Sequence, residues 1–419
     1  MKSFDLKYGK GVVPAVLPDA SVSQVLMPAK AHPPEDEVAE VERALDAPIG
    51  SPRLESIARP GMKTVVMVSD GTRPCPSWKF LPSLLGRLRK AGVRDADITI
   101  VFGMGIHRSQ TEAEKRSLVG EEVYRSVRCV ESTESGRYVH LGNTSRGTPV
   151  DVCPEVAECD LLICTGNIEY HYFAGYSGGA KAVLPGACSR RTVEANHAMQ
   201  LLPGAELGSY DENPVRQDIE EAGRMIGIDF ILNVVLDESK RIVRAVAGDT
   251  VAAHAVGRRE VDALYGVAIS GLADIILVSA GGAPKDVNMY QAQKALENAA
   301  RAVRPKGTII LVAECPEGLG EPVFEEYMTG FPLDEIIERI RARFVVGGHK
   351  AAAIARVLKK ADVCLVSAMD EALVRRCKMS PFRRVQEALT AAFEKHGAGA
   401  SVIVMPYGGS TVPLLKKAN

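Results

Sequence analysis

Histidine and lysine side chains follow apolar runs in the first half of the sequence, where they are placed to do acid–base or nucleophilic chemistry. His107 follows "DITIVFGMG", and His171 and Lys181 lie in "EYHYFAGYSGGAKAVLPG", after "CDLLICTG". Histidine can move protons near neutral pH, because its ordinary pKa is about 6.5. The glycines before Lys181 let the backbone approach a ligand, and the lysine can bind phosphate or act as a nucleophile. A helix-capping histidine is the alternative for His107, and a solvated loop lysine is the alternative for Lys181.

The segment "SDGTRPCP" places Asp70, Thr72 and Arg73 directly after another apolar run, "KTVVMVS". Arginine forks onto a carboxylate or phosphate with two parallel hydrogen bonds, so Arg73 is a candidate for binding an acidic ligand. A turn with a surface Asp–Arg pair is the competing interpretation.

Metal and nucleotide signatures are weak in this sequence. His171 and His197, even with Cys188, do not make a strong metal pattern, and a buried structural histidine explains either ring. Ala182 follows Lys181, so the segment departs from the phosphate-binding pattern GxxxxGK[ST], and GxGxxG is also absent.

A second set of candidates lies in "SAGGAPKDVNMYQAQKALENAARAV", where a glycine turn precedes an expected helix. Gln291 and Lys294 are three residues apart and therefore share one helix face, and the N-terminus of such a helix favours an anion. An ordinary exposed helix face is the alternative. His254 is interpreted as a surface or packing residue, as are His32, His140 and His396.

The elements that must position these residues alternate between strand and helix. Apolar runs predict strands at 63–70, 97–105, 159–166, 273–282, 307–315, 361–368 and 400–406, with amphipathic helices between them and hairpins at the N-terminus and at 230–249. This alternation predicts the α/β class, with two α/β domains and mostly parallel sheets. Ligands of such sheets bind beyond the carboxyl ends of the strands, where Asp70, His107 and Lys181 fall.

The predicted domains are an N-terminal cofactor-binding and catalytic domain over 1–268 and a C-terminal α/β domain over 269–400. Residues 401–419 are predicted to form a last strand and a tail, for which a return to the N-terminal domain is one possible arrangement. The 419 residues carry a net charge of -1, which gives no reason to expect binding to nucleic acid or to a membrane. Nine cysteines without a CxxC pair predict reduced thiols and a cytoplasmic location.

The motifs "SDGTRPCP", "GIHRSQT", "EYHYFAGYSGGAKAVLPG", "ANH" and "YQAQKAL", taken in this order, resemble the nickel-dependent lactate racemase family. The resemblance runs along most of the chain. It implies a racemase or epimerase, an isomerase that inverts C2 of a 2-hydroxy acid through a 2-keto acid, with its active site in the cleft between the domains.

The cofactor implied by the resemblance is a nickel-pincer nucleotide: Ni(II) with a pyridinium-3-thioamide-5-thiocarboxylic acid mononucleotide, covalently attached at Lys181. His197 matches the nickel ligand, and His107 and His171 match two acid/base histidines. Arg73 and Lys294 match residues that hold or polarise the substrate. The remaining residues expected near the cofactor are Asp70, Thr72, Gly175, Ser177, Gly178, Tyr290 and Gln291. The implied partners are a small 2-hydroxy acid and the enzymes that make the cofactor, and a homo-oligomer is left open.

Three departures from the lactate enzyme bear on the substrate. Gly71 stands in place of a histidine, Ala180 in place of an arginine, and "VVGGHK" at 345–350 has no tryptophan. They favour a larger acid, such as a sugar acid or an aryl or branched hydroxy acid, over lactate. The alternatives are a dehydrogenase or hydrolase that uses free nucleotide or zinc, and a non-catalytic protein that binds the cofactor or a hydroxy acid.

Overall fold

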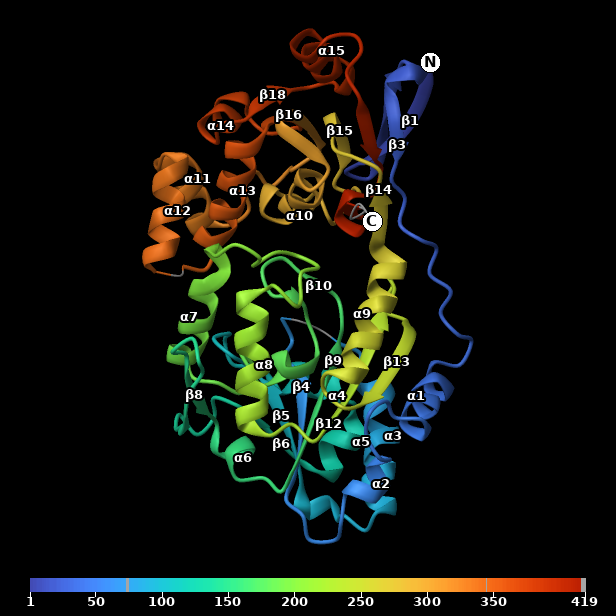
Figure 1. The fold of residues 1–419 in the computed structure, drawn as a ribbon, viewed down its shortest axis with the longest axis vertical. Coiled ribbons are helices and arrows are strands. Elements are labelled where there is room, and N and C mark those ends of the chain that lie inside the picture. The colour runs from blue at the N-terminus through green and yellow to red at the C-terminus, as the bar shows by residue number, and fades with distance from the viewer. Residues whose placement is uncertain (73–74, 344, 416–419) are drawn as a thin grey trace. The chain divides into compact units, whose positions relative to one another are not determined.

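The structure is a computed structural model, which describes residues 1–72, 75–343 and 345–415. The chain divides into two compact units (Figure 1). Unit 2 is continuous, from Ala31 to Asp262, whereas unit 1 combines Met1–Lys30 with the chain from Ala263 onward. The chain therefore passes between the units twice.

Unit 2 is an α/β unit that carries the first three candidate loops. Its strands are β4 (Thr64–Ser69), β5 (Ile98–Gly103), β6 (Arg128–Glu131), β7 (Val139–Asn143), β8 (Pro149–Val152), β9 (Leu161–Asn167), β10 (Tyr170–His171), β11 (Gly175–Tyr176), β12 (Phe230–Leu236) and β13 (Ile242–Gly248). Its helices are α1 (Glu37–Asp46), α2 (Leu54–Ile57), α3 (Ser77–Lys90), α4 (Glu112–Val119), α5 (Glu121–Ser126), α6 (Pro154–Ala157), α7 (Arg190–Ala198), α8 (Pro214–Ile226) and α9 (Ala252–Tyr265), with a short 3-10 turn, η3 (Gly179–Ala182).

The main sheet of unit 2 has the order β13-β12-β9-β4-β5-β6. All neighbouring strands are parallel except β12 and β13, which form an antiparallel hairpin. From β4 the chain moves outward through β5 and β6, and it then returns to the other side of β4 with β9. The direction of winding thus reverses between β4 and β9, the kind of point where open α/β sheets bind ligands beyond their strand ends.

Apolar clusters stabilise unit 2. One packs α1, α3, α4 and α5 against the sheet, with Phe80 and Phe102 fully buried. A second joins α7, α8 and β8 to the segment after β9, through Phe173 and Leu184. The helices α7 and α8 lie next to each other (Figure 1). Because its apolar residues enter the second cluster, the glycine-rich segment is part of the folded core.

Unit 1 contains a second α/β sheet. Its strands are β1 (Lys2–Tyr8), β2 (Gly11–Leu17), β3 (Val22–Val25), β14 (Gly266–Ile269), β15 (Ala273–Ser279), β16 (Val303–Val312), β17 (Asp362–Val366), β18 (Ser380–Phe382), β19 (Val402–Met405) and β20 (Val412–Leu415). Its helices are α10 (Met289–Ala300), α11 (Pro322–Gly330), α12 (Leu333–Ala342), α13 (Gly348–Lys360), α14 (Glu371–Arg376) and α15 (Val385–His396).

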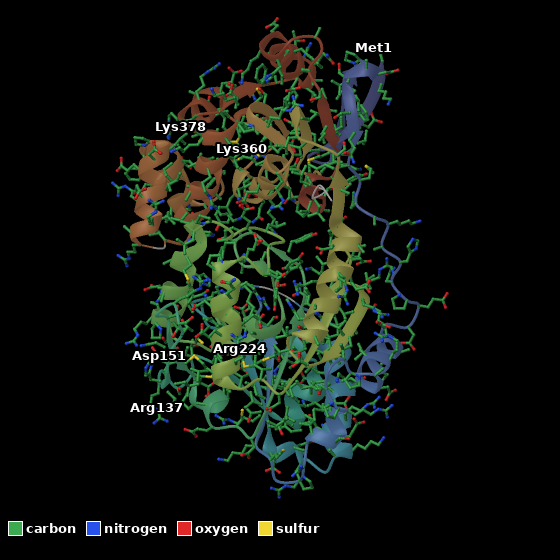
Figure 2. All side chains as sticks on the ribbon, viewed as in Figure 1. Met1, Arg137, Asp151, Arg224, Lys360 and Lys378 are labelled. Atoms are coloured by element: carbon green, nitrogen blue, oxygen red, sulfur yellow. The ribbon has the colours of Figure 1, made fainter. Side chains whose placement is uncertain are left out.

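The main sheet of unit 1 has the order β18-β17-β16-β15-β19-β3, and every pairing in it is parallel. One apolar cluster packs α10 to α13 against it, and another packs α15 and the β1–β2 hairpin. Exposed charged side chains surround both units, among them Arg137 and Arg224 on unit 2 and Lys378 on unit 1 (Figure 2).

The predicted α/β class with mostly parallel sheets is confirmed. The structure groups residues 1–30 with the C-terminal part, because β3 pairs with β19, whereas the sequence placed them in the N-terminal domain. It also keeps β19 in the C-terminal sheet. Within the described residues, no helix combines the length and the apolar character needed to cross a membrane.

Candidate active site

The loops after β4 and β5 join their functional side chains directly. The Nδ1 atom of His107 is hydrogen-bonded to Oδ2 of Asp70, and it lies 2.9 Å from Oγ1 of Thr72. Thr72 in turn donates its hydroxyl and its backbone N–H to the other carboxylate oxygen of Asp70, at 2.8 and 3.0 Å. The three residues form one network at the carboxyl ends of two adjacent parallel strands.

Asp70 is ionised within this network. Burial raises the pKa of its carboxyl group, but hydrogen bonds from His107 and Thr72 outweigh burial and hold the pKa below its ordinary value. A carboxylate only accepts hydrogen bonds, so the proton of the neutral His107 ring lies on Nδ1. His107 therefore presents an unprotonated Nε2, and its side chain is 38% exposed, so that nitrogen can act as a base.

A half-buried glutamine, Gln110, holds the loops of Asp70 and His107 in fixed positions. The side-chain oxygen of Gln110 accepts from the backbone N–H of Gly71 at 2.7 Å. The backbone N–H of Gln110 donates to Glu131, at the end of β6, also at 2.7 Å. The loop of Asp70 and the loop of His107 are thus fixed to each other and to the sheet.

The segment that contains Lys181 closes back onto the end of β5. The carbonyl oxygen of Gly186 accepts from the backbone N–H of Gly105 at 3.1 Å and from the hydroxyl of Ser132 at 2.7 Å. The backbones approach so closely that a Cβ atom on Gly186 would lie 2.1 Å from the carbonyl oxygen of Ala182. The turn that carries Lys181 is therefore attached to the strand that leads to His107.

The glycines before Lys181 are required by the protein's own packing. A Cβ on Gly175 would lie 1.8 Å from the carbonyl oxygen of Ser209, and one on Gly178 would lie 2.7 Å from Ile168. Both residues have positive φ angles, 76° and 74°. The hydroxyl of Ser177, predicted to contact a cofactor, donates to the carbonyl of Asn167 at 2.8 Å and accepts from the N–H of Glu169 at 2.9 Å.

Buried side chains from α8 and α9 hold the carbonyl groups of the same turn. Arg216, which is fully buried, donates to the carbonyl oxygens of Tyr176 at 3.1 Å and Gly178 at 3.3 Å, and it pairs with Glu220 at 2.5 Å. His254 donates from Nε2 to the carbonyl of Ser177 at 2.8 Å. Burial and the charge of Arg216 lower the pKa of His254 well below its ordinary value, so this ring is neutral.

His171 lies on the two-residue hairpin β10–β11, opposite Gly175. It is 6% exposed, and its Nδ1 atom accepts from the backbone N–H of Ala174 at 3.2 Å. The neutral ring therefore carries its proton on Nε2. In the neutral form, His171 therefore carries its proton on Nε2 and His107 carries it on Nδ1, so the two rings differ in tautomer.

His197, on α7, shares an aromatic neighbour with His171. The ring of Phe173 meets His171 at a centroid distance of 4.6 Å and His197 at 4.9 Å, both nearly edge to face. The Nδ1 atom of His197 lies 3.2 Å from the side-chain oxygen of Asn196. An amide oxygen accepts, so Nδ1 carries the proton and Nε2 is left with a lone pair.

Asn196 is itself oriented by a buried chain of polar groups. Its amide N–H donates to Asp218 at 2.8 Å, and Asp218 accepts from the hydroxyl of Thr144 at 2.5 Å. Such outer partners fix the ring of a metal-binding histidine. In the described part of the chain, no three His, Cys, Asp or Glu side chains are grouped to hold a metal ion.

The remaining predicted residues lie on α10, in unit 1. The side chains of Gln291 and Lys294 are exposed. The carbonyl of Tyr290 accepts from Lys350 at 2.7 Å, and the Lys350 ammonium lies 3.7 Å from the centre of the Tyr290 ring. Arg73 lies outside the described residues.

Two of the departures noted in the sequence lie in different surroundings. Ala180 is fully buried in the apolar cluster of α7 and α8, where it faces Gly223. A Cβ on Gly71 would lie 3.2 Å from the side-chain oxygen of Gln110. Ala180 therefore points into the core although it belongs to the turn that carries Lys181, whereas Gly71 lies next to Gln110 between the loops of Asp70 and His107.

Sequence reasoning missed several residues that position this site. It interpreted His254 as a surface or packing residue and did not single out Arg216, Asn233 or Asp218. Asn233 accepts from the backbone N–H of Gly179 at 2.9 Å. These side chains lie on helices and strands far along the chain, and the available signal was Asn233, a polar residue in the otherwise apolar strand β12.

Comparison with known proteins identifies the family. Residues 8–208 match the model of the lactate racemase N-terminal domain, and residues 269–412 match that of the lactate racemase C-terminal domain. A lactate racemase of Lactiplantibacillus plantarum is 36% identical, covering 97% of this chain and 99% of that protein. A lactate racemase of Thermoanaerobacterium thermosaccharolyticum is 32% identical, covering 98% of this chain and 99% of that protein.

A solved structure agrees with these matches. The apoprotein of lactate racemase from Thermoanaerobacterium thermosaccharolyticum superposes with a TM-score of 0.88 at 32% identity, covering 99% of this chain and 100% of that chain. Both domain models, both relatives and this solved structure are lactate racemases or their domains. The chain therefore belongs to the lactate racemase family.

Proposed function

We propose that this enzyme inverts C2 of a 2-hydroxy acid by proton-coupled hydride transfer, using a nickel-pincer nucleotide tethered at Lys181. Membership of the lactate racemase family makes the chain an isomerase of the racemase type. The observation that carries the finer proposal is the arrangement of three histidines. His107 is paired with Asp70 as a base, and His171 and His197 both pack against the ring of Phe173.

The residues present fit the proposed cofactor. Lys181 lies on a turn held by buried side chains, and His197 has the outer hydrogen bond expected of a metal ligand. Lys181 would hold the nucleotide covalently and His197 would hold the nickel. When bound, the group supplies a reversible acceptor for the hydride at C2, which the twenty standard side chains do not provide.

Proton transfer is the part of the reaction that the chain's own residues perform. His107 accepts the hydroxyl proton at Nε2 while Asp70 stabilises the imidazolium that forms, as a carboxylate does in a catalytic triad. The substrate becomes a planar 2-keto acid, and His171 would return a proton for the opposite enantiomer in its imidazolium form. In the reverse reaction the roles are exchanged: His171 accepts the hydroxyl proton and His107 returns one. Both rings must therefore gain and lose a proton during the catalytic cycle.

The same proposal assigns roles to residues of both units. Lys294 and Gln291 belong to unit 1, whereas the histidines and Lys181 belong to unit 2. Lys294, together with Arg73, would bind the substrate carboxylate and polarise the carbonyl. A larger acid than lactate stays part of the proposal, supported by Gly71 and by the sequence "VVGGHK", but not by the buried Ala180.

The test is to produce the protein together with enzymes that make the cofactor and to measure nickel, sulfur and the mass of the peptide containing Lys181. The expected result is a covalent adduct on Lys181, and loss of optical purity in at least one chiral 2-hydroxy acid. Lys181→Ala should carry no adduct. Lys63→Ala, an exposed lysine before the amino end of β4, is the matched control and should load normally.

Two further variants separate an enzyme from a binding protein. His107→Ala and His171→Ala should keep the adduct and lose turnover. Unchanged turnover in both variants would favour a different reaction, and an unmodified Lys181 in active protein would contradict the tether.

A further inference from the structure

The carboxylate of Asp262 binds two tyrosines that flank His171. Tyr170 and Tyr176 each donate a phenol hydroxyl to the same oxygen, Oδ1 of Asp262, at 2.7 Å. The tyrosines face each other across the β10–β11 hairpin, with ring centroids 5.3 Å apart. The only other residue pair in that hairpin is His171 and Gly175.

A hairpin of two residue pairs has little stability of its own, because two strands without a larger sheet are marginal in water. Its position therefore depends on contacts from outside. Hydrogen bonds to an ionised carboxylate are among the stronger ones available. Two such bonds converge on Asp262, one from each strand, so this side chain closes the hairpin next to the residue that carries the imidazole.

Asp262 is the last of a row of contacts along one face of α9. His254, Arg258 and Asp262 are spaced by four residues and therefore lie on the same face of the helix. His254 donates to the carbonyl of Ser177, and the guanidinium of Arg258 lies 5.6 Å from the centre of the Tyr176 ring. Between them, a Cβ on Gly257 would lie 2.3 Å from Ile168, so α9 packs tightly against the chain that leads into the hairpin.

This helix also carries the chain from one unit to the other. Asp262 is the last residue of unit 2, and α9 continues to Tyr265 in unit 1. The carboxylate that closes the hairpin thus lies at one of the two crossings between the units.

We propose that Asp262 is a positioning residue for His171: by binding Tyr170 and Tyr176 together, it holds the hairpin so that the imidazole stands where protons are transferred. The inference rests on the proposed role of His171 as an acid/base. It adds that the geometry of His171 is set from the helix that crosses between the units.

The first test compares holoenzyme variants by kcat, KM and the fraction of Lys181 that carries the adduct. Asp262→Ala removes the oxygen that accepts both hydrogen bonds and should lower kcat about 100-fold, the size of effect expected from a misplacement near 1 Å. Asp262→Asn keeps an oxygen acceptor but loses the charge that strengthens both bonds, and it should lower kcat about tenfold. KM and the adduct fraction should stay within about twofold of wild type. Glu260→Gln, on the same helix, is the matched control and should leave kcat unchanged.

The second test reads His171 directly in the full-length protein without cofactor. Ring ¹⁵N resonances of labelled histidines should change for His171 in Asp262→Asn, while those of His107 stay as in wild type. Tyr170→Phe and Tyr176→Phe each remove one bond and should each give part of the effect of Asp262→Ala. If an Asp262 variant fails to fold, the two phenylalanine variants still test the proposal, because each removes only one hydroxyl group.

The outcomes separate the two proposals. If His171→Ala abolishes turnover but Asp262→Asn and both phenylalanine variants keep wild-type kcat, the positioning role is overturned and the proposed function stands. If the variants lose only adduct or melting temperature, with normal kcat in the loaded fraction, the positioning role is also overturned. If His171→Ala itself keeps full turnover, the proposed function fails first.

Discussion

At the scale of single residues, the pairing of Asp70 with His107 is the contact with the clearest chemical consequence. The sequence predicted Asp70 near the cofactor and His107 as an acid or base, and the structure joins them by a hydrogen bond. Since Asp70 is 2% exposed and ionised, its charge acts on the imidazole with little solvent screening. His107, with this carboxylate as its partner, is therefore a better base than a surface histidine that has no such partner.

Asp70→Asn should therefore remove turnover without removing the cofactor. The amide cannot stabilise an imidazolium as a carboxylate does, and it can favour the wrong tautomer of His107, so we expect kcat to fall at least about 100-fold. Steady-state kinetics on loaded enzyme, with the Lys181 adduct quantified by mass, checks this. A variant with normal loading and normal kcat would show that Asp70 does not support His107.

The same carboxylate should make stability depend on acidic pH. The pKa of Asp70 is lower in the folded protein than its ordinary value, so its contribution to the free energy of unfolding is complete above about pH 4–5 and is lost as pH falls through the folded-state pKa. The stability difference between wild type and Asp70→Asn, from urea unfolding, should be larger at pH 6 than at pH 3. An equal difference at both pH values would contradict the ionised, hydrogen-bonded state.

At the scale of elements, the turn before Lys181 is fixed by backbone geometry rather than by side chains of its own. Gly175 has a φ of 76° and no room for a Cβ beside the carbonyl of Ser209. Gly136 also has a positive φ, 62°, but nothing lies within 4 Å of its Cβ position. Substitution of Gly136 therefore measures the free-energy cost of a left-handed conformation alone, whereas substitution of Gly175 adds the cost of a steric clash.

Gly175→Ala should destabilise the protein by about 3 kcal/mol or more, because strain and overlap add. Gly136→Ala carries only the strain and should cost about 1 kcal/mol. Urea unfolding of both variants measures the difference. Equal losses would mean that the contact with Ser209 relaxes easily and that the turn is not rigid.

Arg216 is the side chain on which that turn depends most. Its guanidinium is fully buried, pairs with Glu220 and binds two carbonyl oxygens. Arg216→Met would leave the buried Glu220 carboxylate without its cationic partner and would remove a donor from both carbonyls, which should cost about 3–5 kcal/mol. Thermal and urea unfolding would show this. A loss below about 1 kcal/mol would mean that water reaches the cluster.

The elements themselves were largely readable from the sequence, because apolar runs such as "KTVVMVS" and "CDLLICTG" have a local pattern. The strands β4, β5, β9 and β15 appear where they were predicted. What the pattern did not show is long-range pairing: β3 joins β19 across the whole chain, and no local signal specifies that partner. The same holds for the site, where the loops were predicted but the supports from α8 and α9 were not.

At the scale of the whole molecule, unit 1 is built from both ends of the chain. The β1–β2 hairpin covers one face of its sheet, where Leu6 and Leu17 are fully buried against strands β15 and β16. The hydroxyl of Ser279, at the end of β15, also donates to the carbonyl of Lys7 at 2.6 Å. The N-terminal residues are therefore part of the core of unit 1.

This arrangement predicts opposite results for two deletions. Removing residues 31–262 and joining Lys30 directly to Ala263 should leave a folded unit, because Ala29 already donates to the carbonyl of Leu264 at 3.1 Å and the ends to be joined lie side by side. Removing residues 1–262 instead takes away β3 and the hairpin, and it exposes an apolar sheet face. Circular dichroism and urea unfolding should show a cooperative transition for the first protein and none for the second. If both proteins unfolded cooperatively with the same free energy of unfolding, residues 1–30 would contribute nothing to the stability of unit 1. The pairing of β3 with β19 and the packing of the β1–β2 hairpin would then not be needed for this unit to fold.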